Sequence, residues 1–88
     1  MKIKDGFVLK KVAGSYMIAA TGDKFVGFSS VITTNETGAY IWEMLLANKT
    51  KGEICNALVS EYEGVSADEI ANDIDEFIEE LKKNNILE

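Results

Sequence analysis

The side chains that could do chemistry in this chain are mostly carboxylates, together with one thiol. The 88 residues contain a single cysteine, Cys55, and no histidine, arginine or proline. Histidine is the commonest general base and the commonest metal ligand, and structural zinc sites take cysteine and histidine in sets of four. We therefore expect no metal site, no bound cofactor and no enzymatic activity of the chain alone.

Cys55 falls beside the apolar positions of a predicted helix, and the chain has no histidine that could deprotonate its thiol. Cysteine in such a place behaves as a small hydrophobic residue, so we favour packing over a nucleophile or a redox sensor. One cysteine forms no internal disulfide, and no apolar run approaches the ~20 residues of a membrane span. These features predict a cytoplasmic protein with no membrane association.

The carboxylates are concentrated in one segment near the C-terminus. Its acids are Asp68, Glu69, Asp73, Asp75, Glu76, Glu79 and Glu80. They do not follow the spacing of a calcium-binding loop, and they fall within a predicted helix. The favoured interpretation is a solvated helix face, and the alternative is contact with a basic partner.

Charge is unevenly divided along the chain, whose net charge is −6. Residues 1–50 hold six lysines against four acids, whereas residues 51–88 hold three lysines against eleven acids. An acidic half disfavours any partner that must be bound through its phosphates. We therefore expect no nucleic acid among the partners.

Three β-prone stretches occupy the first part of the chain. Residues 7–12 and 16–21 are apolar and β-branched runs separated by a glycine-containing turn, a pattern that predicts a hairpin. A third extended stretch covers residues 25–34, with a bulge or kink before residues 31–34 because glycine and serines interrupt it. The pattern predicts a three-stranded antiparallel sheet.

Helical periodicity begins at Asn35, which has the side chain of an N-cap, and continues to about Ala47. Thr50 and Glu53 have the spacing of a capping box, which predicts the start of a second helix. That helix should end at residues 63–64, where a glycine follows a glutamate.

A third helix is predicted from Ser66, which forms another capping box with Glu69. Residues 84–85 should end this helix, and residues 86–87 should fold back onto the core. Its apolar residues recur at helical spacing and form one face, made of Ile70, Ile74, Phe77, Ile78 and Leu81.

Three strands followed by three helices predict one α+β domain over residues 1–88, with a fold like that of a winged helix-turn-helix. Helices on one face leave the sheet with open edges, and an open edge can accept a strand from another chain. Residues 31–34 contain neither lysine nor glutamate, the charged residues that discourage pairing of an edge strand with another chain. The pattern leaves open whether they form an ordinary internal strand or a binding edge, and a homodimer through that edge is also open.

The run Ile32-Thr33-Thr34-Asn35-Glu36-Thr37-Gly38-Ala39-Tyr40-Ile41-Trp42 resembles the PqqD-like family, named for the small protein of pyrroloquinoline quinone biosynthesis. Residues 7–16, Phe-Val-Leu-Lys-Lys-Val-Ala-Gly-Ser-Tyr, are also similar to its stand-alone members, and the resemblance extends to the tail through residues 61–62, Asp73, Phe77 and residues 86–87. One position departs from the family pattern, because Thr34 stands where leucine usually precedes the asparagine.

The resemblance implies a winged-helix-like peptide recognition element that binds the leader of a ribosomally made precursor peptide. Such proteins present the leader to a modifying enzyme, often a radical S-adenosylmethionine enzyme, in natural-product biosynthesis. The leader adds as a strand beside the third strand and the third helix. Carried onto this chain, the peptide-binding residues are Val31, Ile32, Thr33 and Thr34, with Ala71, Ile74, Asp75, Ile78 and Lys82 chosen as the helix flank.

Two functions of different classes follow from this sequence. The first is non-catalytic binding of a leader peptide by strand addition. The second is a winged-helix DNA-binding regulator, whose recognition helix should be basic, whereas the third helix here carries seven acids against two lysines. A general protein-interaction module using the same open edge cannot be separated from the first by sequence.

Overall fold

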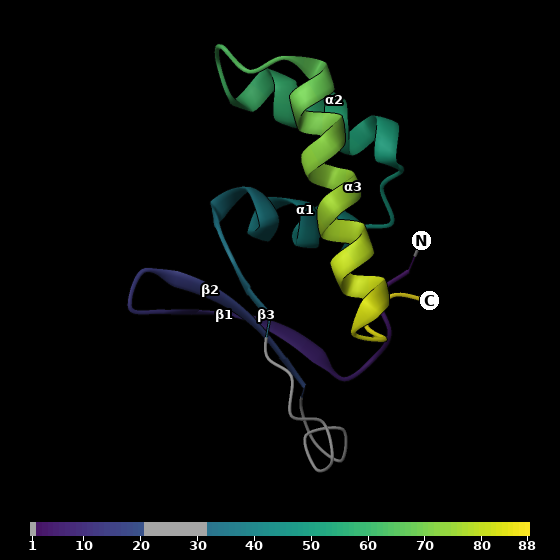
Figure 1. Cartoon of the computed structure of the whole chain (residues 1–88). Helices are drawn as coiled ribbons and strands as arrows, with labels where there is room; N and C mark the ends of the chain where they lie inside the picture. The colour runs from purple at the N-terminus through teal and green to yellow at the C-terminus, as the bar shows by residue number, and fades with distance from the viewer. Residues whose placement is uncertain (1, 21–31) are drawn as a thin grey trace.

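The computed structural model describes residues 2–20 and 32–88, and this part of the chain contains strands followed by helices (Figure 1). The elements in chain order are β1 (Phe7–Val12), β2 (Ser15–Ala20), β3 (Ile32–Thr34), α1 (Glu36–Leu46), α2 (Lys51–Glu61) and α3 (Ala67–Lys83). The predicted α+β class, with an antiparallel three-stranded sheet before three helices, is confirmed.

β1 and β2 form the predicted hairpin, which projects away from the helices in Figure 1. Their antiparallel register runs from the pair Phe7↔Ala20 to the pair Val12↔Ser15. The two turn residues have positive φ, 51° at Ala13 and 83° at Gly14. Positive φ at both central positions is the mark of a type I′ turn, whose twist matches that of the strands it joins.

β3 lies at one edge of the sheet, whose strand order is β1-β2-β3. It pairs antiparallel with β2, through Ile18↔Ile32, Met17↔Thr33 and Tyr16↔Thr34. Of the predicted stretch over residues 25–34, the structure confirms a strand from Ile32. Residues 25–31, Val31 included, lie outside the described residues.

All three helices begin at the predicted caps, because each cap side chain satisfies an otherwise unpaired backbone N–H. The Asn35 side chain accepts from the N–H of Gly38 at 2.9 Å. Thr50 and Glu53 form a complete capping box, and the Ser66 hydroxyl accepts from the N–H of Glu69 at 3.2 Å. Side chains close in sequence therefore fix where each helix starts.

The core lies between the sheet and the helices. Ile18 and Ile32 contribute from the sheet, and Trp42 of α1 is 1% exposed. The third helix contributes the face predicted for it, Ile70, Ile74, Phe77, Ile78 and Leu81. This one apolar face spans most of α3, so burial holds the helix in a fixed orientation.

Residues 2–4 and 86–88 lie side by side at the C-terminal end of α3 (Figure 1). The N–H of Lys4 donates to the carbonyl of Ile86, and the N–H of Glu88 donates to the carbonyl of Lys2, both at 2.8 Å. Ile86 and Leu87 are buried, as predicted for the tail. No helix in the described part of the chain is long and apolar enough to cross a membrane.

Candidate functional site

The outer edge of β3 is the first component of the candidate site. β2 pairs with one edge of β3, and within residues 2–20 and 32–88 no strand pairs with the other. Ile32 is buried, Thr33 is exposed and Thr34 is half-buried, the alternation of a strand with one covered face. Every second residue of such an edge strand points its N–H and C=O away from the sheet, where another chain can bind them.

A groove of about 390 Å³ lies between the β3–α1 junction and α3. β3 and the first turns of α1 form one wall, and α3 forms the other. Its lining residues are Thr33, Thr34, Asn35, Thr37, Gly38, Ile41, Asp73, Glu76, Phe77 and Glu80. The groove therefore adjoins the free edge of β3 directly.

The wall at the β3–α1 junction depends on a close approach between Thr34 and Gly38. A Cβ atom added to Gly38 would overlap the Thr34 hydroxyl and lie 2.9 Å from the Thr34 Cβ. The Gly38 N–H donates to the Asn35 side chain. The asparagine and the glycine of the Asn-Glu-Thr-Gly sequence therefore have different roles. Asn35 caps the helix, and Gly38 leaves room for the side chain of Thr34 in the strand.

The α3 wall is acidic. Asp73, Glu76 and Glu80 are exposed, at positions i, i+3 and i+7 of the helix, and the buried ring of Phe77 lies between them in sequence. Within residues 2–20 and 32–88, no lysine lines the groove. Among the described residues, none of these three carboxylates forms an ion pair.

The helix stripe predicted to face the peptide lies on another side of α3. Ile74 and Ile78 are in the core, Ala71 is half-buried and Lys82 is exposed. None of the five stripe residues lines the groove. Of the predicted strand residues that the structure describes, Thr33 and Thr34 line the groove, and Ile32 is buried in the core.

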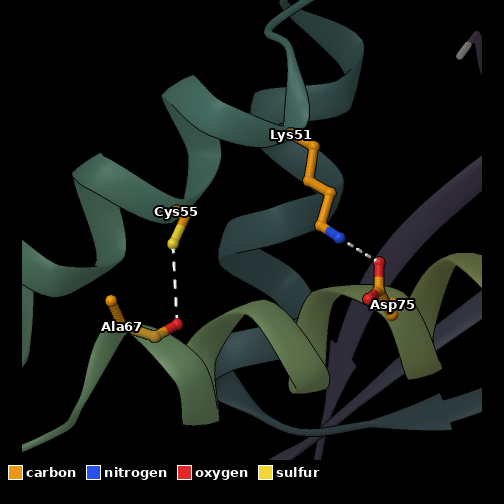
Figure 2. Close-up of polar contacts among 4 residues, drawn as sticks. All are labelled: Lys51, Cys55, Ala67 and Asp75. Atoms are coloured by element: carbon orange, nitrogen blue, oxygen red, sulfur yellow. Dashed lines mark hydrogen bonds and ion pairs between the residues drawn. The ribbon is translucent and has the colours of Figure 1, made fainter.

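Asp75, the remaining residue of the predicted stripe, faces α2. Its Oδ1 lies 2.6 Å from the Nζ of Lys51, and Figure 2 shows the two side chains pointing toward each other from α3 and α2. Figure 2 also shows Cys55, whose half-buried thiol donates to the carbonyl of Ala67 at 3.8 Å. These two contacts join α2 to α3, so this flank of α3 packs against α2. Cys55 is packed against the core, as expected.

Comparison with known proteins shows which family the chain represents. The family model of coenzyme PQQ synthesis protein D (PqqD) matches residues 15–87, far more than half of the chain. The chain belongs to the PqqD family. The predicted resemblance is therefore confirmed. No curated protein matches the chain significantly.

Two solved structures have the fold of this PqqD-family chain. "TbiB1 in Complex with the TbiA(beta) Leader Peptide" has a TM-score of 0.79 and 24% identity, and the match covers 100% of this chain and 95% of that one. "Lasso peptide synthetase B1 complexed with the leader peptide" has a TM-score of 0.77 and 20% identity, covering 97% and 93%. At these identities the likeness shows a shared fold, three antiparallel strands followed by three helices.

Two groove residues could have been found from the sequence. Asp73 and Phe77 are positions at which the chain resembles the PqqD-like family, and both line the groove. Glu76 and Glu80 lie three and seven residues after Asp73, on the same side of the helix. Periodicity identifies such a stripe, but it does not say which stripe faces the sheet.

Proposed function

We propose that this PqqD-family chain binds the leader segment of a ribosomally made precursor peptide and presents it to a separate modifying enzyme. The observation that carries the proposal is the outer edge of β3, with which no strand of the described residues pairs, beside a groove walled by α3. The titles of both similar structures name a complex with a leader peptide. Family membership adds support from the sequence.

The proposed mode of binding is strand addition at β3. Main-chain hydrogen bonds to the free edge supply affinity, and pockets that receive alternate side chains supply specificity. Thr33 and Thr34 of β3 line the groove beside this edge, and the opposite wall is lined by residues between 73 and 80 of α3. A peptide lying along β3 would direct every second side chain toward α3.

This function requires no catalytic group in the chain itself. Strand addition needs no general base, nucleophile or metal, and the chain has no histidine and one thiol, which is engaged with Ala67. The reaction on the peptide would belong to the partner, for which a radical S-adenosylmethionine enzyme is the first candidate from the family resemblance. Presentation then means that one chain holds the leader while another modifies the rest of the peptide.

The proposal is tested by affinity capture of the tagged protein from a lysate of the cells that encode it. Mass spectrometry would identify bound peptides and proteins together. We expect a short peptide encoded as a precursor, recovered with a modifying enzyme. Recovery of duplex DNA or transcription proteins without such a peptide would instead favour the winged-helix regulator and contradict the proposal.

A further inference from the structure

The charge of the groove indicates what kind of peptide it binds. Asp73, Glu76 and Glu80 line one wall, and the other lining residues that the structure describes are uncharged. The three carboxylates are exposed, and within the described part of the chain none has a cation within ion-pair distance. The described residues of the groove would therefore present three negative charges and no positive one to a bound peptide.

The neighbouring charges of α3 are arranged differently. Asp75 is paired with Lys51 of α2. Lys82 and Lys83 are in the last turn, where they complement the negative end of the helix dipole. Three other exposed acids of α3, Asp68, Glu69 and Glu79, also form no ion pair among the described residues, but they do not line the groove. The groove wall therefore carries three of the six unpaired acids of this helix.

The three groove carboxylates weaken the helix that carries them. Asp73 and Glu76 are three residues apart, and Glu76 and Glu80 are four apart, so each pair lies on adjacent turns of one face. Like charges at these spacings destabilise a helix. A ligand with positive charge would relieve this repulsion, whereas an acidic or apolar ligand would not.

The spacing of the carboxylates suits an extended peptide. Glu76 and Glu80 are separated by about 6 Å along the helix axis, at about 1.5 Å per residue. Side chains on one face of a strand recur about every 7 Å. Two basic residues separated by one residue in an added strand would therefore meet two successive carboxylates of the groove wall.

We propose that the peptide bound by this groove is basic, with lysine or arginine at alternate positions whose side chains face Glu76 and Glu80 of α3, while Asp73, about 4.5 Å from Glu76 along the helix axis, extends the acidic wall. This inference rests on the proposed function and names the class of peptide. The main chain of β3 supplies sequence-independent hydrogen bonds, and the acidic wall supplies the preference for charge. Exposed ion pairs are individually weak, so selectivity comes from several acting together.

The test is selection of a displayed library of random linear peptides on the full-length protein. Enriched peptides would be synthesised and their dissociation constants measured on the wild type and on two triple variants. The groove variant carries Asp73→Asn, Glu76→Gln and Glu80→Gln. The control carries Glu61→Gln, Glu63→Gln and Asp68→Asn, three exposed acids that do not line the groove. Both variants change the net charge from −6 to −3.

We expect enriched peptides with basic residues at alternate positions. The groove variant should bind them roughly 5- to 30-fold more weakly, the control should bind almost as the wild type does, and added salt should narrow the difference. An equal loss of affinity in both variants would mean that the overall charge of the protein attracts the peptides, and it would overturn the inference.

The selection itself gives a second outcome. Enriched peptides without basic residues would overturn the inference but would remain compatible with strand addition. If no peptide is enriched, both proposals are wrong.

Discussion

The side chain of Thr34 occupies the space that a Cβ atom on Gly38 would fill. Thr34 is the last residue of β3, and Gly38 is in the first turn of α1. Their contact sets how closely the helix approaches the strand, and both residues line the groove. Thr34 is also the position where the PqqD-like pattern usually has leucine, so this chain forms the junction with a smaller side chain.

We predict that Gly38→Ala destabilises the protein, although alanine is the better helix former. The new methyl group would overlap the Thr34 hydroxyl, and overpacking of this kind typically costs about 1–3 kcal/mol. The free energy of unfolding is measured by urea denaturation. A variant as stable as the wild type would show that the Thr34 side chain does not fill the space beside Gly38.

Two further variants make this prediction specific. Gly52→Ala, in α2, has no atom nearer than 3.9 Å to the added Cβ, so it should be neutral or stabilising by up to about 1 kcal/mol. Thr34→Ala removes the overlapping hydroxyl, so it should recover part of the stability lost in Gly38→Ala. A double-mutant cycle measures that coupling, and strictly additive effects would argue against direct contact.

Thr33→Pro should weaken binding of a selected peptide by about 10-fold or more, because proline removes a backbone donor and crowds the strand edge. Thr33 is exposed, whereas Ile32 is part of the core and its replacement would also leave a cavity. Thr33→Val keeps the N–H and serves as the control. Circular dichroism and the Tm report whether the sheet persists.

The same prediction can be tested without changing the protein. Methylating alternate backbone nitrogens of the peptide removes its own donors, and one alternate set should lose affinity while the other tolerates the change. If every methylated peptide bound as tightly as the parent, backbone pairing would play no part in recognition.

The two flanks of α3 should respond differently to loss of one charge. Glu76→Gln, in the groove, should weaken binding of a basic peptide roughly 2- to 5-fold. Asp75→Asn, on the flank paired with Lys51, should leave the affinity within about 2-fold. Isothermal titration calorimetry distinguishes these outcomes. The opposite ranking would favour the stripe containing Asp75, which remains a prediction as a peptide contact.

Acid should weaken the cap of α2. The Thr50 N–H donates to the Glu53 carboxylate and holds the pKa of Glu53 below its ordinary value. The Thr50 side chain and the charge of Lys49 lower this pKa further, by smaller amounts. A lowered pKa in the folded state contributes stability above the unfolded-state pKa, and this is lost as the pH falls through the folded-state pKa. Glu53→Gln should therefore flatten the pH dependence of unfolding in that acidic window. A profile identical to the wild type would contradict this account.

The sequence predicted the fold well where the signals are local. Asn35, Thr50 and Ser66 identify the three helix starts because a cap bonds to a backbone N–H only two or three residues away. The apolar face of α3 follows from its spacing alone. The turn was predicted at residues 13–15 and is one residue shorter, because Ser15 already pairs in β2. Ala13 gives no sign of its positive φ in the sequence.

The candidate site was predicted less completely because it depends on contacts between distant segments. Periodicity defined several stripes on α3, but the packing of α2 against Asp75 and of β3 beside Phe77 decides which one adjoins the sheet. The role of Gly38 also depends on a side chain in another element. Sequence therefore predicted the third strand but left open whether it was internal or an edge, and tertiary packing places that strand at the edge and the α3 wall beside it.

The central claim is that a peptide adds to the free edge of β3. Nuclear Overhauser spectroscopy of an isotope-labelled protein with a selected peptide tests this most directly, because paired strands bring backbone protons of both chains close together. We predict cross-strand contacts between the peptide backbone and Thr33 or Thr34, together with peptide side-chain contacts to Glu76 and Phe77. Contacts confined to β1, or to a helix with none to β3, would contradict the account.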